Sequence, residues 1–502
     1  MKEAEELHKR IIALLDTGRT FDAKKLIEEK YTSFKKNPNQ DLFVILEIGC
    51  SHISIGQDLR DKNFAKIGLD ILLKHKSQLE KVLTPQSLHY NIGNGYQAIY
   101  DSSLVEKTDT FPTVEEVKGD LALAKVHFWK SYKEIDLTQL DESSIMLLTN
   151  LGNNLILSGR IVEALQLFDS VLQFDPAFVN AQASKAEALK WHTKLSDTPI
   201  SISLFAEMYR LYKSATEHSV WSKKKTEQLT AGKNYFQQWL TDHDVKIGEL
   251  DREFVQNQIE FENHTSEEKF YLTNFFSLSE HGLYCFCNGA TPDRLTIGTP
   301  ELVTFDKVII AMEFTLNQLK SEFSLARRLF YEYMEGGEDS MHFEKISENY
   351  ISGIVAERLR TSFRLCFGIL DKIANGICTL YDLNCENENI YFESFWRKSK
   401  SCPRWAKIKE IRNIHLTALY SMACDLNTRE GELKQFKEWR NALEHKTFTL
   451  TEESMADEKM AFLLKSFSTK KEFEFKTKHL MQLTRAAIFS FVYCVRAERL
   501  QK

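Results

Sequence analysis

The stretch LGNNLILSGRIVEALQLFDSVLQFDP (151–176) decides the fold of the first half of the chain. Its apolar residues recur at the three- and four-residue spacing of two amphipathic helices, and Gly159 marks the turn between them. Small residues at Gly152 and Ala164 allow the two helices to approach closely, and Phe168 fills the space beside them. The stretch therefore predicts a tightly packed helical hairpin.

This spacing is similar to that of the tetratricopeptide repeat, a helical hairpin that stacks on copies of itself. We predict about five such helix pairs over residues 1–220, stacked as a solenoid with a concave recognition face. An ordinary helical bundle is the alternative. The weaker copies are residues 11–30, which repeat Gly18, Arg19 and Ala23; residues 48–71, with Gly49, Ala65 and a longer turn; residues 88–132, interrupted by the polar segment 101–120; and a unit that begins at Ala183 and resumes at Phe205.

The composition favours a helical protein. The 502 residues include only 8 Pro and 20 Gly, which disfavours a turn-rich β-sandwich, and the hydrophobic fraction of 43% excludes a disordered chain. A net charge of -6 does not indicate a globally basic nucleic-acid binder. The nine scattered cysteines, an odd number, argue against a disulfide framework. With no signal sequence and no apolar run of roughly 20 residues, we expect a cytoplasmic protein without a membrane span.

The middle of the chain, residues 221–300, is interpreted as a helical bridge followed by a loop-rich linker. Its loop contains Cys285 and Cys287, the closest pair of cysteines in the chain, with His281 nearby. Structural zinc sites use four ligands, and no second pair follows this one. We therefore predict buried thiols, no metal and no cofactor, with a zinc site as the alternative.

The last two hundred residues contain four sequence blocks whose order along the chain is informative. The blocks are SLARRLFYEY (324–333), AERLRTSFRLCFGILDKIA (356–374), NIYFESFWRK (389–398) and RNALEHK (440–446). Together they resemble a large subfamily of the HEPN superfamily, in which the HEPN domain follows tetratricopeptide-like repeats. The predicted fold is therefore all-α, with a four-helix-bundle HEPN domain over residues 301–502. Its helices are expected at 349–383, 407–425, 431–446 and 473–500.

The R-x4-H motif of this resemblance is formed by Arg440, Asn441 and His445. Histidine is the residue type that most often serves in proton transfer, so His445 is the candidate general acid or base. Arg440 can donate two hydrogen bonds to phosphate oxygens, and Asn441 can orient the imidazole. On a continuous helix, Arg440 and His445 point about 140° apart. Their convergence requires either that the helix ends near His445 or that a second copy supplies part of the site.

Further polar residues are predicted around this motif with less support. Three residues on the long helix 349–383, Asp371, Lys372 and Asn375, are possible site-lining residues. Residues 397–412 hold seven Lys or Arg against one Glu, which suggests a contact with RNA phosphates. The alternatives are surface polar groups, solvated helix faces and an Arg440–Glu444 ion pair. The basic residues assigned to RNA binding are Arg397, Lys398, Lys400 and Arg404.

The resemblance implies a metal-independent endoribonuclease that cuts RNA by attack of the 2'-hydroxyl group. It also implies a homodimer, because the motifs of HEPN ribonucleases meet at a dimer interface. The solenoid is then a sensor that gates the nuclease, with a protein or peptide regulator on its concave face. Family context suggests antiviral defence or toxin-like growth arrest in bacteria. The alternative is a non-catalytic scaffold that binds RNA or protein partners.

Overall fold

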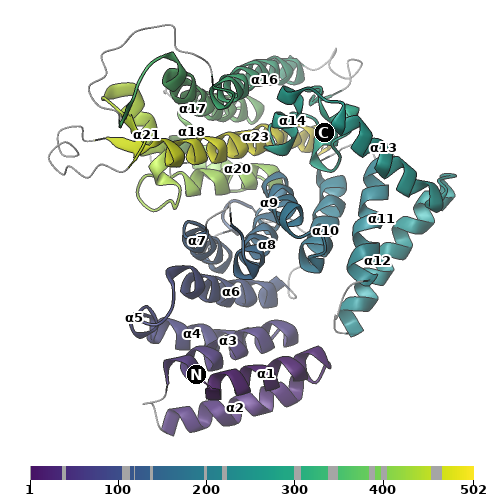
Figure 1. The fold of residues 1–502 in the computed structure, drawn as a ribbon, viewed down its shortest axis with the longest axis vertical. Coiled ribbons are helices and arrows are strands. Elements are labelled where there is room, and N and C mark those ends of the chain that lie inside the picture. The colour runs from purple at the N-terminus through teal and green to yellow at the C-terminus, as the bar shows by residue number, and fades with distance from the viewer. Residues whose placement is uncertain are drawn as a thin grey trace. The chain divides into compact units, whose positions relative to one another are not determined.

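The computed structural model describes most of the chain and divides it into two compact units. The first unit comprises residues 1–191 and 200–247, and the second comprises residues 192–199 and 248–502. Both are built mainly from helices, which confirms the all-α prediction (Figure 1). The described residues are 2–36, 41–104, 113–117, 119–135, 139–196, 201–217, 223–298, 307–336, 349–383, 390–396, 404–453 and 466–501.

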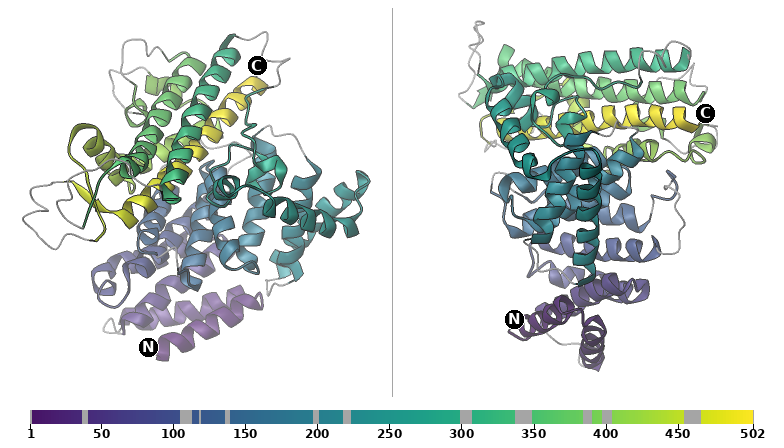
Figure 2. Two further views of the ribbon diagram at one scale, coloured as in Figure 1. Left: turned by 45° about the horizontal axis from the view of Figure 1, so that its top comes forward. Right: turned by 90° about the vertical axis from the view of Figure 1, so that its right-hand side faces the viewer.

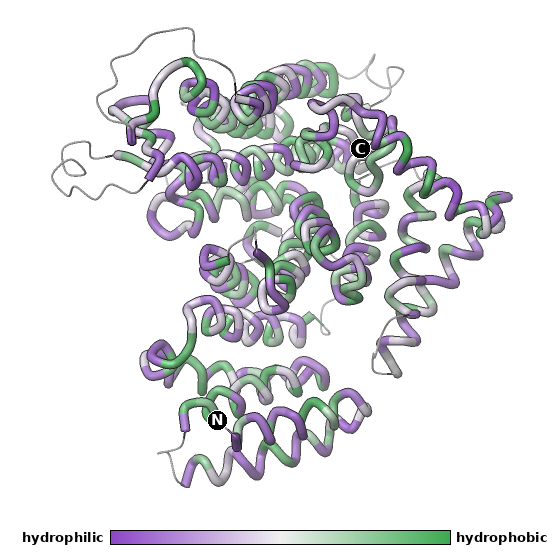
Figure 3. The backbone as a smooth tube through the Cα atoms, in the orientation of Figure 1, coloured by the Kyte–Doolittle hydropathy of each residue, from purple (hydrophilic) through white to green (hydrophobic). Residues whose placement is uncertain are grey.

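The first unit is a succession of helical hairpins. Apolar and polar stretches alternate along these helices, as expected where each helix buries one face (Figure 3). Helix α1 packs on α2, α3 on α4, α6 on α7, α8 on α9 and α11 on α12. The bounds are α1 Lys2–Asp16, α2 Thr20–Lys36, α3 Leu42–Leu59, α4 Lys62–Lys74, α5 Lys76–Leu79, α6 Pro85–Ser103, α7 Asp120–Tyr132, α8 Glu142–Leu157, α9 Ile161–Phe174, α10 Val179–Leu195, α11 Ile202–Glu217 and α12 Lys223–Asp242.

The first and fourth of these hairpins turn in the same way. Gly18 and Gly159 both adopt a left-handed backbone, with φ of 71° and 80°, a conformation that glycine adopts without steric cost. In each turn the following arginine donates its backbone N–H to a carbonyl five residues earlier. The matching sequence GR-x3-A therefore encodes a shared helix-ending motif, as the sequence comparison predicts.

Close helix approach at glycine is also confirmed. A Cβ atom on Gly152 would lie 2.5 Å from Cε1 of Phe168, so only glycine fits beside this ring. The same arrangement joins α6 to α7, where a Cβ on Gly93 would lie 2.7 Å from the ring of Phe128. Helices α6 and α7 pack together although most of the segment 101–120 lies between them in the sequence, as predicted for an inserted segment.

Two details of the repeats differ from the predictions. The link between α3 and α4 is short, consisting of Arg60 and Asp61, because the extra residues of this unit lengthen α3 instead of the turn. The last pair joins α11 to α12, whereas residues from α10 and α11 were predicted to pair. Here the ring of Phe236 on α12 lies 5.1 Å from that of Phe205 and 5.7 Å from that of Tyr212.

Within the described residues, one helix, α3, is long and apolar enough to cross a membrane by length and composition. In the structure α3 packs closely against α4. A Cβ atom on Gly56 would lie 2.5 Å from the backbone nitrogen of Ala65. The buried residues of α3 also include the polar side chains of Ser51 and His52. These contacts are those of a core helix of the first unit.

The second unit is centred on a bundle of four helices (Figure 2). They are α16 (Lys307–Met334), α17 (Ile354–Leu380), α20 (Ile414–Asp425) and α23 (Lys470–Gln501). Helix α17 packs on α16 and α23, and α20 packs on α23. Further helices belong to the same unit. They are α13 Leu250–Glu262, α14 Ser266–Thr273, α18 Phe392–Phe395, α19 Arg404–Ile408 and α21 Lys434–His445, with 3-10 turns η2 Ile247–Glu249, η3 His281–Leu283 and η4 Asn288–Ala290.

The membership of the bundle differs from the predicted set. Helix α16 is one of the four, and α21 lies beside α17. The predicted helix at 407–425 is divided into α19 and α20, because Asn413 caps α20 by accepting hydrogen bonds from the backbone of His415 and Leu416. The start of the predicted helix at 349–383 is a strand, β1 (Tyr350–Ile351).

A small sheet, not predicted from the sequence, follows the motif helix. Its order is β1–β2–β3, with β2 at Thr449–Thr451 and β3 at Phe467–Thr469. Strand β2 pairs antiparallel with β1, where Tyr350 faces Thr451, and parallel with β3. The sheet therefore fixes the chain immediately after α21.

Residues 276–298, expected in part as a linker, pack onto the bundle. Arg485 of α23 donates from Nε to the Ser277 carbonyl over 2.7 Å. Arg327 of α16 forms an ion pair with Asp293, with Nη2 and Oδ2 separated by 2.5 Å. Leu295 and Ile297 are fully buried. The segment is thus an ordered part of the second unit.

Candidate functional site

The motif helix α21 is held by one apolar face. Phe436, Trp439 and Ala442 are buried on it. The ring of Trp439 lies 5.2 Å from that of Phe473 on α23 and 5.6 Å from that of Phe448. These contacts fix the rotation of α21 and therefore decide where its polar residues point.

Helix α21 ends at His445. The next residue, Lys446, has extended backbone angles, with φ of -141° and ψ of 172°, and the chain enters β2 three residues later. The imidazole of His445 is consequently exposed at the helix end. Of the two alternatives drawn from the sequence, the helix end near His445 is therefore present.

Arg440 and Asn441 lie half-buried on the same helix. Nη1 of Arg440 donates a hydrogen bond to Oδ1 of Asn441 over 3.4 Å. In the described part of the chain, no hydrogen bond joins Arg440 or Asn441 to His445, and no ion pair joins Arg440 to Glu444. A single chain therefore presents an arginine–asparagine pair and a separate histidine, as the 140° angle implies.

The structure brings Asp371 of α17 near Arg440. The carboxylate of Asp371 accepts a hydrogen bond from the backbone N–H of Phe392 over 2.7 Å. Burial raises the pKa of this carboxyl above its usual range, while the positive charges of Arg440 and Lys437 oppose that rise. Asp371 is thus a half-buried acid within electrostatic reach of the motif arginine.

Two residues that the sequence reasoning missed complete this charged cluster. Lys437 lies one turn before Arg440 on α21 and forms an ion pair with Glu393 of α18. Glu393 also accepts hydrogen bonds from Asn427 and Thr428. Helical spacing could have identified Lys437, because residues three apart share a face. Glu393 lies within the third family block, which was its available signal.

The other two predicted site-lining residues have local structural partners. Nζ of Lys372 lies 3.0 Å from Oε2 of Glu322 on α16, which is an ion pair between two bundle helices. Asn375 is exposed, and its side chain donates to the backbone carbonyl of Asp371 over 2.9 Å. Both match the alternative of helix contacts and surface polarity.

The predicted RNA-binding cations are only partly described. Arg397, Lys398 and Lys400 lie outside the described residues. Arg404 is only 8% exposed, and its guanidinium carbon lies 5.3 Å from the ring centroid of Phe395. A side chain buried in this way does not present its charge to an RNA phosphate. The structure therefore assigns Arg404 to the packing of α19.

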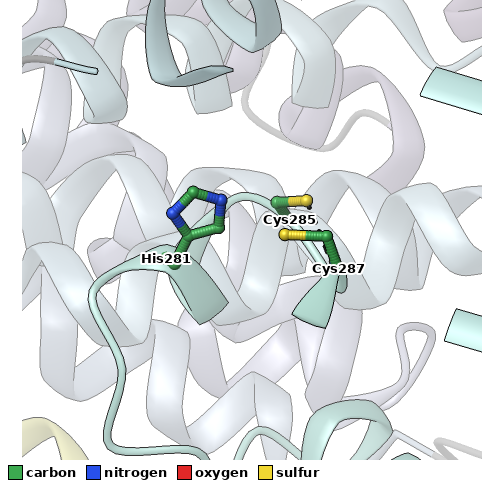
Figure 4. A group of neighbouring side chains, drawn as sticks. All are labelled: His281, Cys285 and Cys287. Atoms are coloured by element: carbon green, nitrogen blue, oxygen red, sulfur yellow. Dashed lines mark hydrogen bonds between the residues drawn. The ribbon is translucent and has the colours of Figure 1, made fainter. Parts of the chain in front are cut away.

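Among the residues that the structure describes, one cluster has the ligand types and spacing to hold a metal ion. His281, Cys285 and Cys287 place one ring nitrogen and two sulfur atoms within 4.8 Å of one another (Figure 4). Hydrogen bonding with Cys285 and, to a smaller extent, with His281 lowers the pKa of the Cys287 thiol to about 4, against the opposing effect of burial. Cys287 is buried as predicted, whereas Cys285 is only partly buried.

Comparison with known families agrees with this geometry. Residues 303–498 match the family model described as LA2681-like HEPN. The C-terminal part of this chain is a HEPN domain. The matched range contains α16, α17, α20 and the motif helix α21 in full, and nearly all of α23. No curated protein and no solved structure matches the chain.

Proposed function

We propose that this protein is a metal-independent endoribonuclease that acts as a homodimer, with the first unit as its sensor. One observation carries the proposal: within a HEPN domain, α21 ends at His445 and leaves its imidazole exposed, one turn beyond the half-buried Arg440. An imidazole, which can accept and donate a proton, and a fixed cation are the two groups that RNA cleavage without a metal requires.

The chemistry follows from these side chains. His445 takes the proton from an RNA 2'-hydroxyl group, and the freed oxygen attacks the adjacent phosphorus. The bond from phosphorus to the 5'-oxygen breaks, and that oxygen receives the proton that His445 has taken up. The products are a 2',3'-cyclic phosphate and a 5'-hydroxyl. Arg440 stabilises the charge that builds on the phosphoryl oxygens.

The geometry of one chain supports the proposed dimer. Arg440 and His445 point about 140° apart on α21 and share no hydrogen bond in the described structure. A second α21 running in the opposite direction, related by a two-fold axis, faces the His445 of one copy with the Arg440 of the other. Lys437 and Asp371 then lie beside the arginine at each of the two sites.

A cavity of about 570 Å³ in the first unit is the proposed regulator site. Its walls come from α3, α6 and α8, which are the first helices of successive hairpins, from α10, and from Lys225 of α12. Among its lining residues are the amides of Asn94, Asn150 and Asn153. Amides offer both donors and acceptors, so they suit the backbone of an extended protein segment.

The deciding experiment compares wild type with His445→Ala on a mixed RNA pool in EDTA, with analysis of the fragment ends. Wild type should cut and leave cyclic phosphates, and the variant should be slower by a factor of about 10² to 10⁴. RNA with a single 2'-deoxy position should resist cutting there. Growth arrest on overexpression in bacteria should follow the same order, as the proposed role in antiviral defence or growth arrest requires.

Mixing two inactive variants tests the dimer. Arg440→Ala and His445→Ala, refolded together, should recover roughly a quarter of the wild-type rate, because half of the dimers are mixed and each has one intact site. Equal cutting by wild type and His445→Ala would contradict the role of His445. No cutting by wild type under any trigger, with RNA still bound, would favour the scaffold alternative.

A further inference from the structure

The irregular segment between η3 and η4 gathers three metal-binding side chains in the second unit. His281 begins η3, and Cys285 and Cys287 follow before η4. Figure 4 shows the three side chains gathered together, with a ring nitrogen of His281 on the side of the two cysteines. Their donor atoms all lie within 4.8 Å of one another. The sequence spacing alone predicts buried thiols, because it shows only the two cysteines as a close pair.

The separation of these atoms fits a tetrahedral ion. Zinc binds sulfur at about 2.3 Å and imidazole nitrogen at about 2.0–2.1 Å, which sets its ligand atoms about 3.5–3.8 Å apart. Atoms already within 4.8 Å reach that spacing by small side-chain rotations. Two thiolates and an imidazole form a soft donor set that selects Zn²⁺ over Mg²⁺ or Ca²⁺. We propose that His281, Cys285 and Cys287 bind one Zn²⁺ ion, with water in the fourth position.

The surroundings orient the three ligands. The hydroxyl of Tyr284 lies 3.0 Å from Nδ1 of His281, which leaves Nε2 as the ligand atom. The backbone N–H of Cys287 donates to Sγ of Cys285 over 3.3 Å. A Cβ atom on Gly289 would lie 3.3 Å from the imidazole and 3.5 Å from Sγ of Cys287, so glycine leaves room beside both ligands.

Residues on either side of this cluster are already fastened to the bundle. Before it, the side chain of Glu280 pairs with Arg496 of α23, with Oε1 and Nη1 separated by 2.7 Å. After it, Asp293 pairs with Arg327 of α16. The residues between these anchors form turns and irregular backbone, without a long helix or strand to support them. A zinc ion bound there stabilises the segment, and this role is separate from RNA cleavage.

Metal content is the direct test. Full-length protein purified without chelators, or reconstituted with Zn²⁺, should hold one zinc per chain. The Cys285→Ser/Cys287→Ser double variant and His281→Ala should hold markedly less. Cys424→Ser, which changes an exposed cysteine on α20, should keep the zinc. His445→Ala should also keep it, which separates this proposal from the proposed nuclease.

Two readouts guard against a variant that fails to fold. With Co²⁺ in place of zinc, wild type should show a thiolate-to-cobalt charge-transfer band and the visible spectrum of four-coordinate cobalt. In wild type, added zinc should also protect Cys285 and Cys287, but not Cys424, from alkylation. Absence of the band in wild type, or unprotected thiols in the presence of zinc, would overturn the proposal. A Cys285–Cys287 disulfide in protein isolated without reductant would also overturn it, in favour of a redox pair.

Discussion

At the scale of single residues, the two equivalent hairpin turns differ in burial. In the fourth hairpin Arg160 is 1% exposed and donates to both carboxylate oxygens of Glu163, each over 2.7 Å. In the first hairpin the corresponding Arg19 and Asp22 are paired over 2.7 Å but are 63% and 55% exposed. Arg160→Ala leaves a buried carboxylate without its cation, so it should destabilise the first unit by about 3–5 kcal/mol.

The control for this prediction is Arg19→Ala. An exposed pair contributes about 0–1 kcal/mol, so this variant should change stability by no more than that. Hydrogen exchange followed by mass spectrometry on fragments from α8 and α9, and from α1 and α2, measures each effect locally. Equal losses of protection in the two variants would show that the buried pair contributes no more than the exposed one.

At the scale of elements, two buried histidines flank one ring of α23. His192 of α10 and His415 of α20 lie 5.4 Å and 5.3 Å from the ring of Tyr493. Burial lowers the pKa of each histidine to about 4. An unfolded histidine titrates near pH 6.5, so unfolding takes up protons between about pH 6.5 and 4. The second unit should therefore lose about 2 kcal/mol of stability per histidine on going from neutral pH to about pH 5.

Urea unfolding at a series of pH values measures this loss, and His415→Gln isolates one contribution. Nε2 of His415 lies 2.8 Å from the Leu195 carbonyl, and a glutamine amide can donate to the same oxygen without titrating. The variant should show a shallower decline in stability below about pH 6.5. A decline as steep as that of wild type would mean that His415 does not carry the effect.

The elements that local patterns specify are those that the sequence predicted. The shared turn at Gly18 and Gly159 and the end of α21 at His445 are each encoded within a few neighbouring residues. The small sheet is not encoded locally, because its strands have two or three residues and β1 pairs with a strand about a hundred residues later. The periodicity of apolar residues along the sequence does not reveal a pairing between strands so short and so far apart.

The candidate site shows the same limit. The motif on α21 was visible in the sequence, and so was Asp371 as a possible neighbour. The burial of Arg404 and Arg485, which are 8% and 2% exposed, could not be predicted from the sequence. The position of a cationic residue in the sequence does not tell whether its charge faces solvent. Whether Cys285 can bind a metal likewise depends on how an irregular segment folds. The periodic patterns that predict helices and strands do not predict the fold of such a segment.

At the scale of the whole molecule, the proposed sensor and nuclease must be coupled in both directions. Suppose that a regulator binds the cavity of the first unit and changes the affinity for RNA by some factor. Bound RNA must then change the affinity for the regulator by the same factor. The proposal therefore makes a reciprocal prediction that does not depend on how the two units are arranged. Any peptide that regulates cleavage through the cavity has to obey it.

The test starts from peptides selected on the purified full-length protein by display. Asn153→Trp fills the cavity from α8 and should weaken peptide binding by about tenfold or more, which is about 1.4 kcal/mol. Met146→Trp adds the same ring to an exposed position of α8 outside the cavity lining and should leave binding unchanged. Peptide affinity is then measured with and without an uncleavable 2'-deoxy-substituted RNA, and RNA affinity with and without peptide. Equal binding of the peptide to both variants would show that it binds outside the cavity. If a bound peptide leaves RNA affinity and cleavage unchanged, the first unit is not a sensor for the nuclease.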